Sequence, residues 1–433
     1  MRICILAAGA GGMYCGSCLR DNALAGALKR LGHQVTLVPL FSPVRTDVAD
    51  QSNNGEVFFG GVNIYLQHAS PLFRHTPRAL DWLLDRKWLL NVATKYGSGT
   101  PPEQLVGLTL DLLLGEEGHA AKEVRRLAGF LRDDVRPDVV TLPNLMFAGV
   151  ARAFQDELKL PVVCELTGED VFLEALGVPG CEQVRDAIRR QVPHIDAFVA
   201  TSGAYAEKMA EYLGVPRERI DVVHPGLPKE FLDAVPPARS HANGRPPTVG
   251  YLARICPEKG LAHLVDGMIH LRQRPGLGNA QLRVGGYLGK KDQPFFEQLQ
   301  RTVNDSPLRG GMTYVGELDQ AGKIALLDSV DVFSVPAHYP EAKGIYLLES
   351  LAHGLPAVQP RLGSFPELLA RTDGGILIAP NDPDALADGL ETLLRDPDRR
   401  ESHGRSGRQV VHTQFTDERM ARDMLTIFEK VRR

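Results

Sequence analysis

The sequence predicts an α/β protein made of two doubly wound domains, each built on a parallel sheet. Short, continuously apolar runs alternate with helical patterns along both halves of the chain. Such alternation is typical of parallel strands that helices cover on both faces. A polar stretch rich in proline and glycine, residues 236–247, separates the halves and indicates a linker. The length of 433 residues fits two large domains.

The first half opens with a strand, a glycine loop, a helix and a second strand. Residues 3–8 are apolar, residues 9–12 are Gly-Ala-Gly-Gly, and apolar side chains recur at helical spacing from 19 to 31. Gly32 ends this helix, and the apolar run 35–40 predicts the next strand. Later runs of the same kind predict further strands at Asp138–Leu142, Pro161–Leu166, Ala197–Thr201 and Ile220–Val223.

We assign residues 1–235 to this N-terminal domain and residues 43–120 to an insertion after its second strand. The insertion carries the segments Pro71–His75 and Trp82–Trp88, and the tryptophans of the second segment have basic neighbours. Three interpretations stay open for it: a lid over a substrate, a patch on a membrane surface, or a helical excursion that buries its tryptophans.

The second half, residues 248–416, repeats the alternation of strands and helices after the linker. Its predicted strands are Thr248–Leu252, Gln281–Val284, Met312–Val315, Val330–Val335, Pro356–Gln359 and Gly375–Ile378. Ligands of doubly wound sheets bind outside the carboxyl ends of the strands. We therefore expect the two Rossmann-like halves to face one another across an interdomain cleft that binds the substrate.

Composition and charge exclude several classes of protein. The formal net charge is −4, so the chain lacks the basic surplus of a nucleic-acid-binding domain, and we expect no nucleic-acid partner. No run reaches the ~18 apolar residues that a membrane-spanning helix requires. Six cysteines in 433 residues indicate a reducing compartment rather than a disulfide framework. We expect a soluble, cytoplasmic protein.

Glycine is unusually frequent. The chain has 43 glycines in 433 residues, whereas glycine usually makes up about 7% of a protein. The loop Gly9–Gly12 resembles a dinucleotide-binding loop, but the third glycine of G-x-G-x-x-G is missing. Leu40-Phe41-Ser42 also stands where a ribose-binding acid would be expected. Two interpretations remain: bare amides at a helix N-terminus that approach a phosphate or a sugar, or a purely structural turn.

Cys15 and Cys18 form a C-x-x-C pair at the predicted start of the first helix. A helix N-terminus lowers the pKa of a thiol, so a redox role is one interpretation. A zinc site would need further ligands, and no second cysteine pair supplies them. The alternative is a reduced pair that packs locally.

The second half carries two groups of charged residues at predicted loops. Arg254 and Lys259 stand five residues apart in a strand-to-helix loop, where both can converge on one anion, although exposed loop cations are common. Glu341 and Glu349 flank Gly344, and the amides that follow this glycine would point at a phosphate. Glu349 would accept from ribose hydroxyls and Glu341 would face a sugar. The alternative is one solvated loop acid and one ordinary helical acid.

In order and spacing, these motifs resemble the family 4 retaining glycosyltransferases of GT-B fold. The resemblance rests on the Arg254/Lys259 loop and on the spacing of Glu341 and Glu349. Segments 202–227, 282–286, 314–318, 354–358, 363–367 and 415–418 extend it. It therefore covers nearly the whole chain except the insertion.

The resemblance implies an enzyme that transfers a sugar, with retention, from a nucleotide-diphosphate sugar to a saccharide, lipid or small-molecule acceptor. Arg254 and Lys259 would bind the donor diphosphate and stabilise its departure, Glu349 would hold the ribose, and Glu341 would position the sugar. Further donor contacts are implied for Gly11, Gly12, Val315, Gly316, Leu318, Lys343, Gly344, Ile345 and Tyr346. Beyond this co-substrate, the resemblance implies no cofactor and no obligatory metal.

Some positions depart from the family pattern. Thr167 stands where family members commonly have a histidine that contacts the donor sugar, so Thr167, Glu169 and Asp170 are our candidates for sugar or acceptor contacts. The last helix, about 417–431, is expected to pack back on the N-terminal domain. A lipid-linked acceptor would place the protein peripherally at the inner membrane face. The competing functions are a GT-B phosphorylase or epimerase and a thiol redox protein that uses Cys15 and Cys18.

Overall fold

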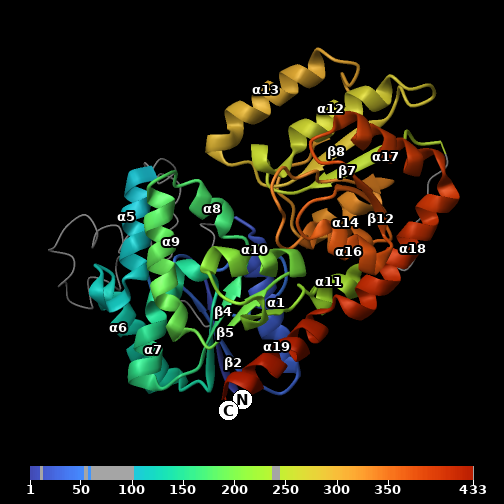
Figure 1. The fold of residues 1–433 in the computed structure, drawn as a ribbon. Coiled ribbons are helices and arrows are strands. Elements are labelled where there is room, and N and C mark those ends of the chain that lie inside the picture. Colours follow the sequence, from blue (N-terminus) through green and yellow to red (C-terminus); the bar gives the residue numbers. More distant parts are fainter. Residues whose placement is uncertain (10–12, 53–56, 60–101, 237–243, 433) are drawn as a thin grey trace. The chain divides into compact units, whose positions relative to one another are not determined.

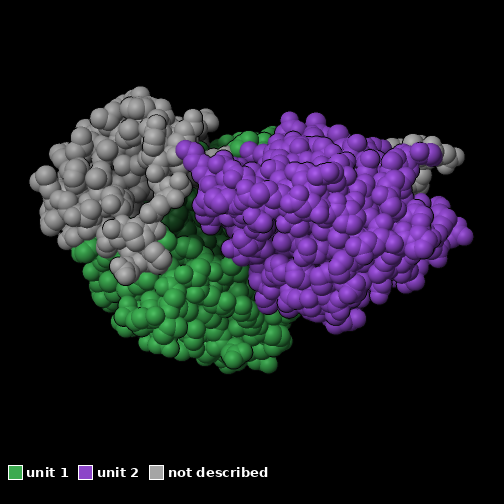
Figure 2. Space-filling model, turned by 90° about the horizontal axis from the view of Figure 1, so that it is seen from above, with its two compact units in different colours: residues 1–226, 417–433 green, residues 227–416 purple. Residues whose placement is uncertain are grey.

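A computed structural model describes the chain except for residues 10–12, 53–56, 60–101, 237–243 and 433. The described residues divide into two compact units. Unit 1 comprises Met1–Gly226 and Asp417–Arg433, and unit 2 comprises Leu227–Thr416 (Figure 2). The segments Pro71–His75 and Trp82–Trp88 of the expected insertion lie outside the described residues.

Unit 1 is built on a parallel sheet whose described strands follow the order β2-β1-β3-β4-β5-β6. The strands are β1 (Arg2–Ala7), β2 (Gln34–Pro39), β3 (Val139–Leu142), β4 (Val162–Leu166), β5 (Ala197–Ala200) and β6 (Ile220–Val222). All residues of β3, β4 and β5 are buried, as continuously apolar strands between two helical layers should be. The strand order reverses between β1 and β3, which is where a doubly wound sheet places its ligand.

The helices of unit 1 surround this sheet (Figure 1). They are α1 (Gly16–Arg30), α5 (Pro102–Leu113), α6 (Ala121–Phe130), α7 (Ala151–Leu158), α8 (Asp170–Glu174), α9 (Gly180–Gln191), α10 (Gly203–Leu213) and α19 (Asp417–Arg432). The C-terminal helix α19 lies beside α1, and its Met424 and Phe428 share one apolar core with Leu24 and Leu28. The end of the chain is therefore part of the N-terminal unit.

Unit 2 is also built on a parallel sheet, and its described strands follow the order β12-β11-β10-β7-β8-β9. The strands are β7 (Thr248–Leu252), β8 (Gln281–Gly285), β9 (Met312–Tyr314), β10 (Val332–Phe333), β11 (Ala357–Pro360) and β12 (Gly375–Ile378). The helices are α11 (Lys229–Ala234), α12 (Leu261–Arg272), α13 (Gln293–Asn304), α14 (Gln320–Asp328), α15 (Ile345–Ala352), α16 (Phe365–Thr372), α17 (Pro383–Arg395) and α18 (Pro397–Gln414). Here the order reverses between β7 and β10.

The structure moves one expected boundary. We expected the first domain to extend to residue 235, but unit 2 begins at Leu227. The Leu227 amide donates to the Phe415 carbonyl at 2.8 Å, and Phe231 and Leu232 of α11 are buried in the core of unit 2. Apolar contacts therefore fix α11 to the second unit, although a proline-rich segment follows it in the sequence.

Candidate active site

Two loops meet in unit 2 where the strand order reverses. One follows β7 and carries Lys259, and the other follows β10 and carries Glu341. Gly260 permits their close approach: it has a φ of +74°, and a Cβ there would lie 1.8 Å from the Pro336 carbonyl oxygen. The His338 amide also donates to the Glu258 carbonyl at 3.0 Å. The glycine thus brings together two residues that are 82 positions apart.

Lys259 and Glu341 form the centre of a buried charged cluster. Lys259 Nζ lies 2.6 Å from Glu341 Oε2 and 2.5 Å from the Tyr339 hydroxyl. Tyr346 and Tyr339 donate to the same carboxylate oxygen at 2.9 and 3.1 Å, and the Lys343 amide donates to Oε1 at 3.3 Å. The predicted residues Lys259, Glu341, Lys343 and Tyr346 therefore meet, and Tyr339 joins them.

Charges in this cluster are fixed by their neighbours. Burial alone would raise the pKa of Glu341, but the charge and hydrogen bond of Lys259 lower it to about 2. Burial opposes the charge of Lys259, yet Glu341 and Tyr339 raise its pKa above the ordinary value. Burial, together with Glu341, raises the pKa values of Tyr339 and Tyr346. At neutral pH the cluster is therefore an ion pair with two protonated phenols.

The depressed pKa of Glu341 predicts a specific pH dependence of stability. Its ionised form stabilises the fold above the ordinary carboxyl pKa near 4.5, and this contribution, at most about 3 kcal/mol, is lost as the pH falls towards 2. Glu341→Gln removes the titrating group. The difference in free energy of unfolding between wild type and Glu341→Gln should therefore shrink from pH 5 to pH 2 in urea titrations. A difference that stays constant over this range would contradict the assigned ion pair.

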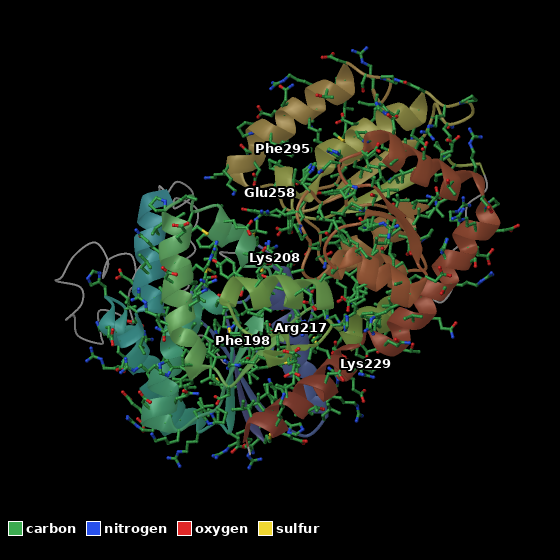
Figure 3. The ribbon with its side chains drawn as sticks, in the orientation of Figure 1. Phe198, Lys208, Arg217, Lys229, Glu258 and Phe295 are labelled. Carbon is green, nitrogen blue, oxygen red and sulfur yellow. The ribbon has the colours of Figure 1, made fainter. Side chains whose placement is uncertain are left out.

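Arg254 belongs to a neighbouring set of contacts in the same loop. Its Nε lies 3.3 Å from Cys256 Sγ, and its terminal nitrogen lies 3.9 Å from Glu258 Oε2 (Glu258 is labelled in Figure 3). Burial alone would lower the pKa of Arg254, but Cys256, Glu258 and Asp292 raise it. The Arg254 side chain is 39% exposed and its guanidinium is permanently charged, so the residue is accessible to an anion from solution.

Glu349 lies on α15 and pairs with a lysine that the sequence analysis did not single out. Lys323 Nζ of α14 lies 2.7 Å from Glu349 Oε1, and both side chains are more than nine-tenths buried. Glu349 is thus not an ordinary solvated helical acid. Helix α14 begins directly after the 315–318 loop, because Asp319 caps it by accepting from the Gly322 amide at 2.8 Å.

The remaining residues predicted to contact the sugar donor lie after the carboxyl end of β9 and at the start of α15. Val315 is 43% exposed, its amide is bonded to the Val284 carbonyl, and Gly316 accepts from the Gly286 amide at 2.8 Å. Leu318 is partly buried against the core of unit 2. Gly344 precedes α15 in the left-handed region, and Ile345 is the first residue of that helix. Gly11 and Gly12 lie outside the described residues.

In unit 1, the three candidates after β4 belong to one buried hydrogen-bonded loop. Glu169 Oε2 accepts from the Thr167 amide at 2.7 Å, and its Oε1 accepts from the Leu145 amide at 3.2 Å. Asp170 accepts from the Tyr205 hydroxyl at 2.7 Å and lies 2.6 Å from Lys208 Nζ (labelled on α10 in Figure 3). Burial raises the pKa of Glu169. Donors of the protein itself therefore bond to the carboxylates of both Glu169 and Asp170. These bonds hold the loop in its conformation.

Cys15 and Cys18 lie at the start of α1 as unbridged thiols. The hydrogen bond with Cys15, and then burial, raise the pKa of the Cys18 thiol. A raised pKa disfavours the thiolate that redox chemistry requires. Nearby, Gly9 has a φ of +79°, and a Cβ there would lie 2.2 Å from the Ser42 carbonyl oxygen, so close backbone packing requires this glycine.

These thiols give a prediction about the redox alternative. The double variant Cys15→Ser/Cys18→Ser should keep the rate of sugar transfer within about threefold of wild type, because the charged cluster of Lys259 and Glu341 lies in unit 2 and involves neither thiol. Release of nucleoside diphosphate by the purified variant is the measurement. A loss of activity in the folded double variant that an oxidant reproduces in wild type would instead support the redox function.

Two negative findings concern the described residues only. Within them, no three His, Cys, Asp or Glu side chains are grouped so that they could hold a metal ion. Of the helices that the structure describes, none is long and apolar enough to cross a membrane.

Two glycosyltransferase family models match the two halves of the chain. A family model described as glycosyl transferases group 1 matches residues 237–410, and the glycosyl transferase 4-like domain matches residues 21–226. A GDP-mannose-dependent alpha-(1-6)-phosphatidylinositol monomannoside mannosyltransferase of Mycobacterium tuberculosis is 27% identical over 290 residues, which are 64% of this chain and 70% of that protein.

Solved structures show the same fold. Sucrose-phosphate synthase from Thermosynechococcus elongatus superposes with a TM-score of 0.71 at 18% identity, over 99% of this chain and 98% of that chain. Anabaena HepE in complex with UDP and glucose gives a TM-score of 0.67 at 16% identity, over 99% and 100% of the two chains. The expected architecture of two parallel-sheet, Rossmann-like domains is confirmed.

Proposed function

The chain belongs to the group 1 glycosyltransferases of GT-B fold, and from this premise we propose that it transfers a sugar, with retention at the anomeric carbon, from a nucleoside-diphosphate sugar. The observation that carries the proposal is the charged cluster at the reversal of the unit 2 sheet. There Lys259 and Glu341 are joined by a 2.6 Å ion pair, and the cation Arg254 stands in the same loop as Lys259.

The two cations suit the chemistry of the leaving group. Breaking the bond from the sugar to the diphosphate leaves negative charge on the diphosphate. Arg254 and Lys259 would offset that charge as donors fixed before the reaction begins, and such donors are typically worth about 100-fold or more in rate. Arg254 supplies a planar fork and Lys259 a point charge, a pairing that suits phosphate oxygens.

The two glutamates would hold the rest of the donor. Glu341 is ionised and has a pKa of about 2, so it cannot serve as a proton donor at neutral pH, and we assign it the positioning of the sugar. Glu349 would accept from the ribose hydroxyls while Lys323 holds its carboxylate. The acceptor would lose its proton to the departing phosphate in a front-side attack.

The donor base and the acceptor are proposed only as classes. The mycobacterial relative is named for GDP-mannose and a phosphatidylinositol mannoside, whereas the Anabaena structure contains UDP and glucose. We infer that the donor is a nucleoside-diphosphate hexose bound by unit 2. The acceptor, a saccharide, lipid or small molecule, would be bound by unit 1.

A donor panel tests this function. Purified protein is mixed with UDP-glucose, GDP-mannose or ADP-glucose together with candidate acceptors, and release of nucleoside diphosphate is followed. Turnover of one donor that depends on an acceptor would support the proposal. If orthophosphate were the only acceptor, the phosphorylase alternative would replace it, and an isomerised nucleotide sugar without release of diphosphate would indicate the epimerase. If no nucleoside diphosphate is released from any donor, the proposal is wrong.

Retention has its own measurement. Proton NMR of the product should show the anomeric configuration of the donor preserved from the first turnover. An inverted product would contradict the retaining mechanism and leave the assignment as a glycosyltransferase intact.

A further inference from the structure

The charged cluster of unit 2 contains one residue for which the proposed function gives no role. Tyr339 follows His338 in the loop after β10, and its ring is partly buried against the core of unit 2. Its hydroxyl is 2.5 Å from Lys259 Nζ and 3.1 Å from Glu341 Oε2. It therefore accepts from the lysine and donates to the carboxylate.

The hydrogen bonds within the cluster leave some donor and acceptor capacity for a ligand. The ammonium group of Lys259 has three N–H donors, and Glu341 and Tyr339 take two of them. Oε2 of Glu341 receives Lys259, Tyr339 and Tyr346, whereas Oε1 receives the Lys343 amide at a longer 3.3 Å. With respect to the described residues, one N–H of the lysine and one carboxylate oxygen thus retain capacity for a ligand.

We propose that Tyr339 is a positioning residue that links diphosphate binding to sugar binding, an inference that rests on the proposed function. By bonding to both ions, its hydroxyl fixes the rotation of the Lys259 ammonium about its stem. The third N–H is then directed to the leaving diphosphate while Oε1 of Glu341 accepts from a sugar hydroxyl. Tyr346 contacts the same carboxylate oxygen through its hydroxyl but serves Glu341 alone in this scheme.

The variant Tyr339→Phe isolates this hydroxyl. Lys259 Nζ lies 5.0 Å from the centroid of the Tyr339 ring and 5.2 Å from that of Tyr346. A phenylalanine keeps the ring and its attraction for the cation, and it loses only the two hydrogen bonds. Tyr346→Phe is the matched comparison, because it removes one phenol hydroxyl from the same carboxylate oxygen.

The experiment is a double-variant cycle on kcat with the donor that wild type turns over. Tyr339→Phe should lower kcat about tenfold in the wild-type background, and by less than about twofold in a Lys259→Met background, because its effect runs through the lysine. Tyr346→Phe should lower kcat by a similar factor in both backgrounds. Thermal melting of each variant confirms that the fold is retained.

Different outcomes separate this inference from the proposed function. If Tyr339→Phe lowers kcat equally in both backgrounds, or leaves kcat at the wild-type value, the positioning role is overturned. Turnover by wild type would still support glycosyl transfer in either case. Failure of wild type to release nucleoside diphosphate from any donor would overturn the proposed function, and this inference with it.

Discussion

Replacing Lys259 by methionine, or Arg254 by alanine, is expected to lower kcat for sugar transfer about 100-fold or more. Each residue would offset negative charge that grows on the diphosphate only as its bond to the sugar breaks, so its loss raises the barrier to that step. Lys259→Met keeps most of the length of the side chain and removes its charge. Release of nucleoside diphosphate at saturating donor is the measurement.

The lysine variant needs a control for folding, because it leaves Glu341 buried without its cation. Removing one partner of a buried ion pair typically costs about 3–5 kcal/mol of stability. In Lys259→Met/Glu341→Gln neither charge remains, so its melting temperature should lie above that of Lys259→Met while its activity stays low. Turnover by Lys259→Met and Arg254→Ala within threefold of wild type would refute their role at the phosphate.

Replacing Glu165 by glutamine is expected to cause a large loss of stability in unit 1. Glu165 of β4 contacts the guanidinium of Arg20 from α1, and both side chains are at most 1% exposed. Burial lowers the pKa of Arg20, and Asp21, 3.6 Å away, opposes that shift. Without Glu165, Asp21 is the acid that remains beside the buried cation among the described residues, and the free energy of unfolding should fall by about 3–5 kcal/mol.

Hydrogen exchange read by mass spectrometry would localise this effect. In Glu165→Gln, amides of β4 and α1 should exchange faster, and amides of β7 and β10 in unit 2 should be unchanged. The matched control Arg20→Met/Asp21→Asn/Glu165→Leu removes the cation together with both neighbouring acids, and replacing a whole buried charged set in this way is often neutral or stabilising. Unchanged exchange in Glu165→Gln would show that the pair contributes little to the fold.

Much of the fold follows from periodicity, and the exceptions have physical causes. Apolar runs predict the strands of both sheets because parallel strands are buried on both faces. The boundary was wrong because the segment 227–235 gives no local sign of which core buries Phe231 and Leu232. The ion pair of Arg20 and Glu165 could not be predicted either, since its partners lie in α1 and β4 and meet only through tertiary packing.

The candidate site likewise contains residues that the sequence motifs predict and residues that only tertiary packing reveals. Motif spacing indicated Lys259, Glu341 and Glu349, and the structure brings the first two together. Spacing could not indicate Lys323, which in the sequence looks like any helical lysine. Its burial beside Glu349 distinguishes it, and that pair forms only in the folded structure. Glu169 and Asp170 were selected because the neighbouring Thr167 replaces the histidine that commonly contacts the donor sugar in the family. Local hydrogen bonds, however, engage their carboxylate oxygens.

A crystal structure with the nucleotide sugar that turns over would test the central claim most directly. We predict density for the diphosphate within hydrogen-bond distance of Arg254 and Lys259, the ribose at Glu349 and the sugar at Oε1 of Glu341. A donor bound away from the loops that follow β7 and β10, with these side chains unchanged, would contradict the assignment of the active site.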